Sequence, residues 1–244
     1  MKFSFVARSE TGPVRKTNED QFLVDADLGL FAVCDGMGGH RGGRRASELA
    51  CETIQSALPD LAGSFPSSSE LQERIEAVIL LAHRRICDEA DHNSSLAGMG
   101  TTCTMFLMSA PDLGIMAHVG DSRLYVLENG IVNQLSEDHS LVNELVKGGM
   151  ISPEEALVHP QNNVIMRALG TTPDPLVSIE MIPINPEQTF LLCSDGLYRY
   201  FPKAGEFQSG LENPDLQAGV DSMVEKALAD GGRDNITCLV FRLE

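Results

Sequence analysis

The chain has 244 residues, and 43% of them are hydrophobic, so it can form one large domain or two small ones around a sizeable buried core. It carries 18 Lys and Arg residues against 35 Asp and Glu residues, which gives a formal net charge of −17. This excess of negative charge excludes a sequence-independent grip on nucleic acid or on an anionic membrane, and a chain of this kind that acts on an anion must recruit cations.

No segment predicts a membrane span or a secretory signal. The longest apolar run covers only residues 77–82, and the N-terminal residues lack the apolar stretch of a signal peptide. Six cysteines are scattered without a C-x-x-C pair, which argues against a zinc ribbon or a disulfide framework and predicts reduced, mostly buried thiols. We therefore expect a cytoplasmic protein with no membrane partner.

The first part of the chain predicts short strands followed by two helices. Strands are expected at residues 3–7, 21–25 and 30–34. The third is an apolar run that stops at Asp35. Apolar residues recur at helical spacing over residues 43–58 and 69–90, and the Gly, Pro and Ser residues from 59 to 69 predict the linker between these helices.

The second part returns to strands. An antiparallel meander is expected at residues 102–109, 114–119, 123–127 and 131–135. Residues 139–170 are polar, helical in pattern and punctuated by Gly, and they interrupt the strands as an inserted flap does. Two more strands (176–181 and 189–193) precede a helix with Asn213 as N-cap, Pro214 at its first position and Gly231 after its end, and a strand over 236–243 follows.

This order of elements predicts an α+β layered domain. Two antiparallel sheets are expected to lie together with helices on their outer faces. The sequence has no internal repeat and no low-complexity tail, and we expect residues 1–244 to form a single domain.

Acidic residues follow the ends of predicted strands at places far apart in the sequence. Each is an Asp beside Gly, Ser, Asn or another acid: Asp20, Asp35, Asp121, Asp195 and Asp234. For any one of them turn formation is the simpler explanation, because Asp next to Gly stabilises tight turns. Five together favour a metal site, since Mg²⁺ and Mn²⁺ prefer hard carboxylate oxygens, and two such ions can activate a water and hold the attacked phosphate.

All five acids fall within a set of six short motifs. They begin at Arg15 (RKTNED), Asp35 (DGMGGH), Gly98 (GMGTT), Gly120 (GDSR), Ser194 (SDGL) and Gly232 (GRDNIT). In this order they resemble the type 2C, metal-dependent family of protein serine/threonine phosphatases, and most closely its compact bacterial members. Each motif is weak alone, but the six together cover almost the whole chain.

The resemblance implies a four-layer α-β-β-α sandwich with Mn²⁺ or Mg²⁺ ions in a cleft at one edge of the sheets. In the family pattern Asp35 bridges two core ions, and Asp195 and Asp234 complete the coordination of one of them. The Gly36 carbonyl and Glu19, in part through water, serve the other ion.

Three further assignments follow from the same resemblance. Asp20 holds waters on the ions from behind the direct ligands. Asp121, together with Asp195, matches a third and weaker metal position found in bacterial relatives. Arg15 matches the phosphate-binding arginine of the family, a role that suits a guanidinium because it can grip a phosphate with two hydrogen bonds.

The general acid is left open by the sequence. A departing serine alkoxide benefits from a proton donor, and histidine titrates in the useful range. In many eukaryotic relatives a histidine directly follows Asp-Gly, where this chain has Met37. His40 is therefore one candidate acid, against packing at the start of the helix or a water on a metal ion as the acid. His159, in the flap, is a second histidine placed to touch the site or the substrate.

Two rival functions are weighed against the phosphatase. Cys193 and Arg199 match C-x5-R, the spacing of cysteine-dependent phosphatases, but Asp195 would repel the phosphate and only Gly196 is available for the amide cradle that such a loop needs. The second rival is a non-catalytic binding module that keeps the fold but has lost its metals. The presence of Asp35, Asp195 and Asp234 argues against it.

We therefore expect an enzyme that hydrolyses phosphoserine and phosphothreonine in proteins by means of a metal-activated water. By resemblance, its partners are phosphoprotein substrates, including a serine/threonine kinase and that kinase's targets. A monomer with two core ions and a weaker third is expected.

Overall fold

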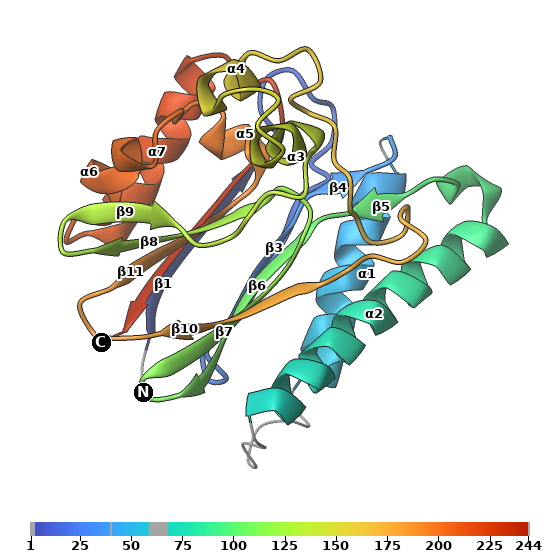
Figure 1. Ribbon diagram of the computed structural model, residues 1–244, viewed down its shortest axis with the longest axis horizontal. Coiled ribbons are helices and arrows are strands. Elements are labelled where there is room, and N and C mark those ends of the chain that lie inside the picture. The colour runs from blue at the N-terminus through green and yellow to red at the C-terminus, as the bar shows by residue number, and fades with distance from the viewer. Residues whose placement is uncertain (1–2, 40, 59–67, 244) are drawn as a thin grey trace.

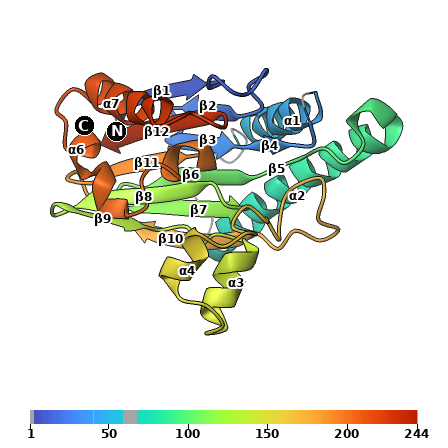
Figure 2. The same ribbon diagram turned by 90° about the horizontal axis from the view of Figure 1, so that it is seen from above.

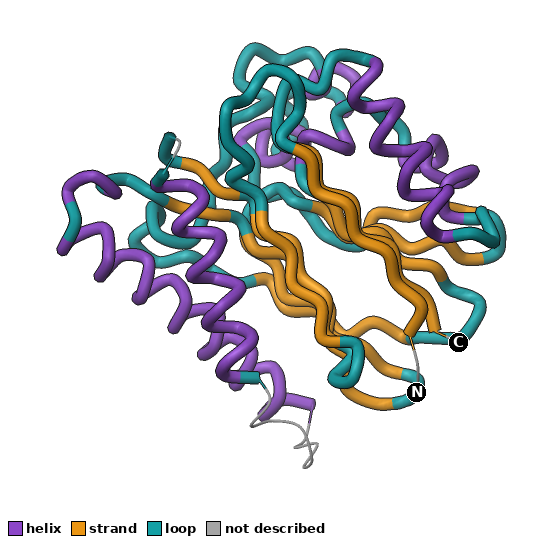
Figure 3. The backbone as a smooth tube through the Cα atoms, turned by 180° about the vertical axis from the view of Figure 1, so that it is seen from behind, coloured by secondary structure: helices purple, strands orange, loops and turns teal. Residues whose placement is uncertain are grey.

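The structure, a computed structural model, describes residues 3–39, 41–58 and 68–243. In these residues two five-stranded antiparallel sheets lie face to face, and helices cover the outer face of each (Figure 1). The tube view from behind shows the two sheets as adjoining layers between the helices (Figure 3). The predicted α+β class and the four-layer α-β-β-α arrangement are confirmed.

The first sheet brings the two ends of the chain together. Its strands, in spatial order, are β1 (Phe3–Glu10), β12 (Ile236–Leu243), β11 (Thr189–Cys193), β8 (Arg123–Glu128) and β9 (Ile131–Gln134). Strands β1 and β12 pair over their whole length, from Phe3 opposite Leu243 to Glu10 opposite Ile236. The loop that follows β1 therefore lies beside the loop that precedes β12.

The second sheet is built around a strand that is buried on both faces. Its strands, in spatial order, are β10 (Ser178–Pro183), β7 (Leu113–Val119), β6 (Cys103–Ala110), β3 (Leu30–Cys34) and β2 (Gln21–Asp25). In β3, Leu30 and Ala32 pack under the helices, whereas Phe31 and Val33 face the other sheet. This double burial explains why the strand reads as an unbroken apolar run. A short pair, β4 (Gly36–Met37) and β5 (Gly100–Thr101), extends beyond the sheet and was not predicted.

Aromatic side chains fill the space between the sheets. Phe31 from the second sheet stacks on Phe241 from the first, with ring centroids 4.0 Å apart, and Phe190 stacks on the same Phe241 at 5.2 Å. Such rings bury large apolar areas and dominate the energetics of a core. The two layers are therefore fixed relative to each other by these rings.

Helices form the outer layers. The second sheet is covered by α1 (Gly42–Ala57) and α2 (Ser68–His92), and the first by α5 (Asp195–Tyr198), α6 (Gln208–Leu211) and α7 (Leu216–Ala229). Short 3₁₀ turns span Ser94–Leu96 and Ala204–Phe207. The first two helices form as predicted from their apolar spacing, but most of the predicted linker lies at residues 59–67, outside the described residues.

The start of the last helix was predicted two residues too early. The side chain of Asp215, rather than that of Asn213, accepts the capping hydrogen bonds, from the N–H groups of Gln217 and Ala218. Asn213 accepts a hydrogen bond from the N–H of Asp215 at 3.0 Å and forms the turn before the helix. Because Asn and Asp both favour caps and turns, the sequence alone did not separate their roles.

The predicted flap is an insertion that projects from the sandwich. It contains α3 (Leu141–Lys147) and α4 (Pro153–Leu157), and Figure 2 shows both helices standing out from the sheets. Its two ends are joined, since the N–H of Met166 donates to the carbonyl of His139 at 2.7 Å. The flap is therefore a closed loop on a narrow neck.

Two further expectations can be compared with the structure. All six cysteines are free thiols, as predicted. Within the described ranges, none of the helices combines the length and the apolar character needed to cross a bilayer.

Candidate active site

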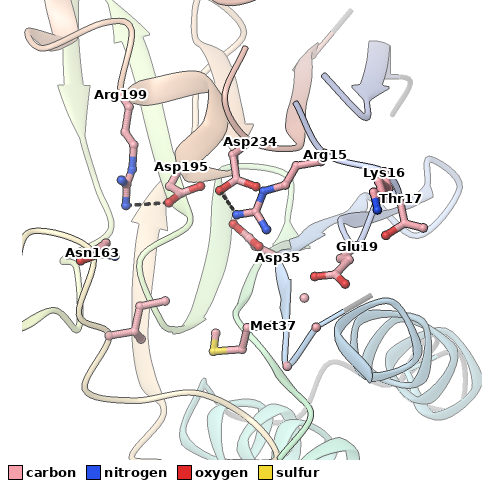
Figure 4. Close-up of a pocket in the computed structure, with 14 residues that line it drawn as sticks. Arg15, Lys16, Thr17, Glu19, Asp35, Met37, Asn163, Asp195, Arg199 and Asp234 are labelled. Carbon is pink, nitrogen blue, oxygen red and sulfur yellow. Dashed lines mark hydrogen bonds and ion pairs between the residues drawn. The ribbon is translucent and has the colours of Figure 1, made fainter. Parts of the chain in front are cut away.

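A cleft of about 410 Å³ lies at the edge of the sandwich where the predicted acids gather. Figure 4 shows its side chains. The described residues that line it are Arg15, Lys16, Thr17, Glu19, Asp35, Gly36, Met37, Gly38, Gly39, Asn163, Ile165, Asp195, Arg199 and Asp234. The structure thus brings together six of the predicted site residues: Arg15, Glu19, Asp35, Gly36, Asp195 and Asp234.

Asp35 stands at the end of β3 with its backbone fully engaged. Its N–H donates to Thr102 Oγ1 at 2.9 Å, and its carbonyl accepts from the N–H of Thr102 at 2.9 Å and from Thr101 Oγ1 at 3.0 Å. Because these bonds hold the main chain, the carboxylate is left to face the cleft. It lies beside that of Asp195, and each of these two carboxyl groups affects the pKa of the other.

Gly36 occupies a position that admits no side chain. A Cβ atom there would lie 2.2 Å from the carbonyl oxygen of Gly43 and 2.5 Å from that of Glu19. Only glycine allows this approach between the strand end, helix α1 and the loop that carries Glu19. The same contact places the main chain of Gly36 in the wall of the cleft.

Asn235 ties the loop before β12 to the loop after β1 at three points. Its Oδ1 accepts from the N–H of Glu19 at 2.9 Å, and its Nδ2 donates to the carbonyls of Thr11 and Thr17, each at 3.0 Å. The neighbouring Asp234 is thereby fixed next to the loop that follows β1. The pairing of β1 with β12 makes this possible.

Two arginines flank the acids from opposite sides (Figure 4). Arg15 Nη2 donates to Asp234 Oδ2 at 2.6 Å, and Arg199 Nη2 contacts Asp195 Oδ2 at 2.7 Å. The Arg15 side chain is 48% exposed, so its ion pair is screened by water and contributes little to stability. Both guanidinium groups border the space in which an anion would bind.

Asp20 lies deeper, behind the direct lining of the cleft. Its Oδ2 accepts from Ser194 Oγ and from Thr237 Oγ1, each at 2.7 Å, while among the described residues its Oδ1 has no hydrogen-bond partner. Burial raises the pKa of Asp20 to about 6, although the hydrogen bonds from Thr237 and Ser194 lower it. An unpaired buried carboxylate oxygen is costly unless a cation or a water satisfies it.

Asp121 is buried on the far side of Asp195. Its Oδ2 accepts from the hydroxyl of Tyr198 at 3.3 Å, and its Oδ1 has no partner among the described residues. Burial, together with the negative charge of Asp195, raises the pKa of Asp121 to about 7. Unlike the core acids, Asp121 lines a separate cavity under the flap rather than the cleft itself.

This set of side chains fits divalent cations. Burial, together with the negative charges of Asp20 and Asp195, raises the pKa of Asp35 well above its ordinary value, as expected where carboxylates crowd without enough positive charge. The donors are hard oxygens, the kind that Mg²⁺ and Mn²⁺ prefer. Within the described part of the chain no three Asp, Glu, His or Cys side chains stand at metal-ligand spacing, so three of these carboxylates would have to move closer together to hold one ion.

The histidine predictions have different outcomes. His40 lies outside the described residues, so its proposed role as acid stays a prediction. His159 lines neither the cleft nor the cavity under the flap, and its Nδ1 instead accepts from the N–H of Gln161 at 3.2 Å. His118 and His139 are buried, and burial lowers their pKa values to about 4 and about 3.

The buried histidines support the loop that carries Asp121. His139 Nδ1 accepts from the N–H of Gly120 at 3.2 Å, the N–H of His139 donates to the Gly120 carbonyl at 2.7 Å, and His139 Nε2 contacts Ser178 Oγ at 2.9 Å. The neck of the flap is therefore bonded directly to the residue before Asp121. These contacts give His139 a structural role.

The alternative thiol mechanism does not fit the geometry. Cys193 is fully buried, and burial, together with the nearby Cys238 thiol, raises its pKa well above the ordinary value. A nucleophilic cysteine needs a lowered pKa and access to the substrate. The C-x5-R spacing is therefore incidental.

Arg199 and the flap residues Asn163 and Ile165 line the cleft but were not singled out as site residues in the sequence. For Arg199 a signal existed, because a residue four positions after Asp195 on a helix lies on the same face. For the two flap residues there was none, since the path of the flap across the cleft depends on tertiary contacts.

Comparisons with known proteins agree with this geometry. The family model described as Protein phosphatase 2C matches residues 15–231. The serine/threonine phosphatase stp of Listeria innocua is 36% identical over 236 residues, which cover 96% of this chain and 93% of that protein. The serine/threonine protein phosphatase PstP of Mycobacterium tuberculosis is 38% identical over 238 residues, which cover 97% of this chain and 44% of PstP.

Solved structures give the same result. A crystal structure of the Mycobacterium tuberculosis phosphatase PstP superposes with a TM-score of 0.87 at 36% identity and covers 100% of both chains. A structure of the catalytic domain of PstP in complex with two manganese ions superposes with a TM-score of 0.86 at 32% identity, over 99% of this chain and 98% of that one. From its fold, its cleft and these similarities, the chain belongs to the protein phosphatase 2C family.

Proposed function

We propose that this protein hydrolyses phosphoserine and phosphothreonine in other proteins and depends on divalent cations to do so. The observation that carries the proposal is the convergence of Asp35, Asp195 and Asp234 on one cleft that Arg15 also lines. Acids alone would repel a phosphate, whereas acids that hold cations next to an arginine attract one. The manganese ions in the PstP structure support this choice of cofactor.

We assign the residues to two core sites and a third. Asp35 would bridge two Mn²⁺ or Mg²⁺ ions, with Asp195 and Asp234 completing the first and the Gly36 carbonyl and Glu19 the second. Asp20 would orient waters from behind, since its free Oδ1 is the kind of acceptor such waters need. Asp121, with Asp195, would hold a weaker third ion.

The bound ions would supply Lewis acidity toward the phosphate and a water activated for attack. The rest of the chemistry falls to the protein. Arg15 binds the phosphate oxygens, and its exposed ion pair with Asp234 exchanges partners at little cost. His40 is one candidate donor of the proton that the departing serine or threonine needs, and a water held near Asp121 is the other.

The biological setting is part of the proposal. We propose that residues 1–244 form one catalytic domain with its flap at about 139–170, that it acts as a monomer in the cytoplasm, and that its substrates include a serine/threonine kinase and that kinase's targets. The formal charge of −17 supports the absence of nucleic-acid and membrane partners.

The test is turnover of a phosphothreonine peptide with Mn²⁺, with Mg²⁺ and with an excess of chelator. Activity should require the metal and resist a thiol alkylator, and Asp35→Asn should abolish it. Asp27→Asn, which changes an exposed aspartate on the hairpin between β2 and β3, is the matched control and should remain active. Full activity in chelator would refute the proposal, and the absence of turnover with any divalent metal would favour a non-catalytic binding module.

A further inference from the structure

A second cavity of about 420 Å³ lies between the flap and the end of α5. The apolar part of its wall comes from three places in the chain. Val142 and Val146 come from α3, Leu157 comes from α4, and Phe201 and Pro202 follow α5. A cavity of this size can take a large side chain with part of its backbone.

The flap exposes apolar side chains to an unusual degree. Neither α3 nor α4 has a buried residue. Several of the large apolar side chains that are exposed in the described structure belong to this segment: Met150, Leu157, Val158 and Met166. Clusters of exposed apolar groups mark surfaces that bind another molecule, because a surface without that role keeps them scattered.

The second cavity adjoins the catalytic cleft. Arg199 lines both, and of the consecutive flap residues Asn162 lines the second cavity while Asn163 lines the cleft. On the opposite wall Asp195 faces the cleft, and Tyr198, one helical turn later, faces the cavity. A polypeptide with its phosphorylated residue in the cleft can therefore pass Arg199 and reach the cavity with a nearby residue.

The charges in the cavity disfavour an acidic occupant. Arg123 is largely buried and is paired with Asp138 at 2.7 Å, so it is not available to a second anion, and Arg199, which is paired with Asp195 at 2.7 Å, also lines the cleft. An apolar side chain gains from the Val, Leu, Phe and Pro wall, whereas a charged one would lose its hydration there.

We infer that this cavity is a recognition subsite that binds an apolar side chain of the substrate protein a few residues from the phosphorylated serine or threonine. The inference rests on the proposed phosphatase function and adds a preference in sequence to it. The inference gives the two parts of the flap different roles. The residues around Asn163 border the phosphate site, and α3 and α4 recognise the peptide sequence.

The experiment compares phosphoserine peptides in which a single Leu, Ser or Glu is moved one position at a time away from the phosphoserine. In the wild type with Mn²⁺, kcat/KM for the Leu peptide should exceed that for the Ser peptide by about tenfold at one preferred distance, with Glu no better than Ser. The ratio of Leu to Ser should fall to about one in Leu157→Asp and in Val146→Asp, which place a charge in the cavity from α4 and from α3.

Val158→Asp is the matched control, because Val158 is adjacent to Leu157 and more exposed (82% against 55%) but does not line the cavity. It should keep the wild-type ratio. Thermal unfolding checks that all three variants are folded. A wild type that cleaves the Leu and Ser peptides equally well, or a ratio that survives in Leu157→Asp and Val146→Asp, overturns the subsite and leaves the proposed function intact. A wild type that cleaves neither the peptides nor an aryl phosphate in Mn²⁺ refutes both.

Discussion

Arg15 lines the cleft, and the proposed function gives it contacts with both the phosphate and a metal ligand. In this structure Arg15 is bound to Asp234, a proposed metal ligand, and the pair is exposed enough to exchange partners. A guanidinium is suited to this exchange because its planar fork recognises carboxylate and phosphate with the same geometry. Phosphate binding and metal binding at this edge are therefore coupled through one side chain.

Replacing Arg15 should weaken phosphate binding without weakening metal binding. Arg15→Ala is expected to lower kcat/KM for a phosphopeptide by tenfold to on the order of a hundredfold, through KM, because bonds to a charged group are lost. Mn²⁺ affinity should survive, since Asp234 loses a competing cation. Arg15→Lys keeps the charge without the fork and should recover only part of the loss. A collapse of metal affinity measured by calorimetry, with KM unchanged, would assign Arg15 another role.

Replacing Asp121 tests the role of the third ion alone, because Asp121 lies outside the cleft and is proposed to hold only that ion. Asp121→Ala should keep two bound ions but lose on the order of a hundredfold in rate on a phosphoserine peptide, if that ion's water donates the proton to the leaving group. An aryl phosphate needs little protonation and should lose far less. Equal losses on the two substrates, with the metal content unchanged, would remove Asp121 from this role and favour His40.

At the scale of elements, the site depends on close contact between α5 and the loop before β12. A Cβ atom on Gly196 would lie 1.9 Å from the carbonyl of Asn235, so the first turn of α5 is pressed against the loop that holds Asp234. Asp195 and Asp234 belong to these two elements. The separation of the two carboxylates is thus set by a contact between backbones.

Gly196→Ala should disturb this contact. We expect a loss of about 2 to 3 kcal/mol in the free energy of unfolding, because overpacking against a main-chain atom forces the helix away. Mn²⁺ should bind more weakly, since the two carboxylates separate. Gly205→Ala is the control, because a Cβ atom there has no neighbour within 4 Å. Urea unfolding and metal titration of both variants measure the effect, and equal behaviour of the two would contradict it.

Some of these elements could be predicted from the sequence, and others could not. The burial of β3 on both faces is readable as an apolar run that stops at Asp35, and the α1 and α2 spacing is equally clear. The start of α7 could not be read from the sequence, because Asn213 and Asp215 are both residues that favour helix caps. The strand ends predicted which acids converge, but the placement of Asp121 in a second cavity depends on the flap, whose position no local pattern encodes.

At the scale of the whole molecule, the way that stability changes with pH should depend on whether divalent cations are bound. Buried carboxylates at the site have raised pKa values, about 7 for Asp121 and about 6 for Asp20, with Asp35 also raised. In the folded protein these groups bind protons that the unfolded chain, with ordinary carboxyl pKa values, releases. Without divalent cations this difference makes the folded state less stable as the pH rises from about 4, the ordinary carboxyl pKa, to the raised pKa values.

The buried histidines act in the opposite direction, but in a lower range. His118 and His139 have pKa values of about 4 and about 3, so between pH 6.5 and these values the unfolded chain binds protons that the folded protein refuses. The stability that the two neutral histidines contribute is therefore lost as the pH falls below about 6.5. In chelator they offset part of the carboxylate effect below pH 6.5, and above that pH the carboxylate effect is unopposed.

Thermal unfolding in chelator from pH 5 to pH 8.5 tests this expectation. The melting temperature of the wild type should fall between pH 6.5 and 8.5, and the fall should be much smaller in the Asp35→Asn and Asp121→Asn double variant, which removes two of the crowded charges. Saturating Mn²⁺ should reverse the trend, because an ion that binds only the folded state stabilises it, and binding requires ionised carboxylates. A melting temperature in chelator that rises steadily to pH 8.5, or an unchanged slope in the double variant, would show that the carboxylates are not crowded as the structure indicates.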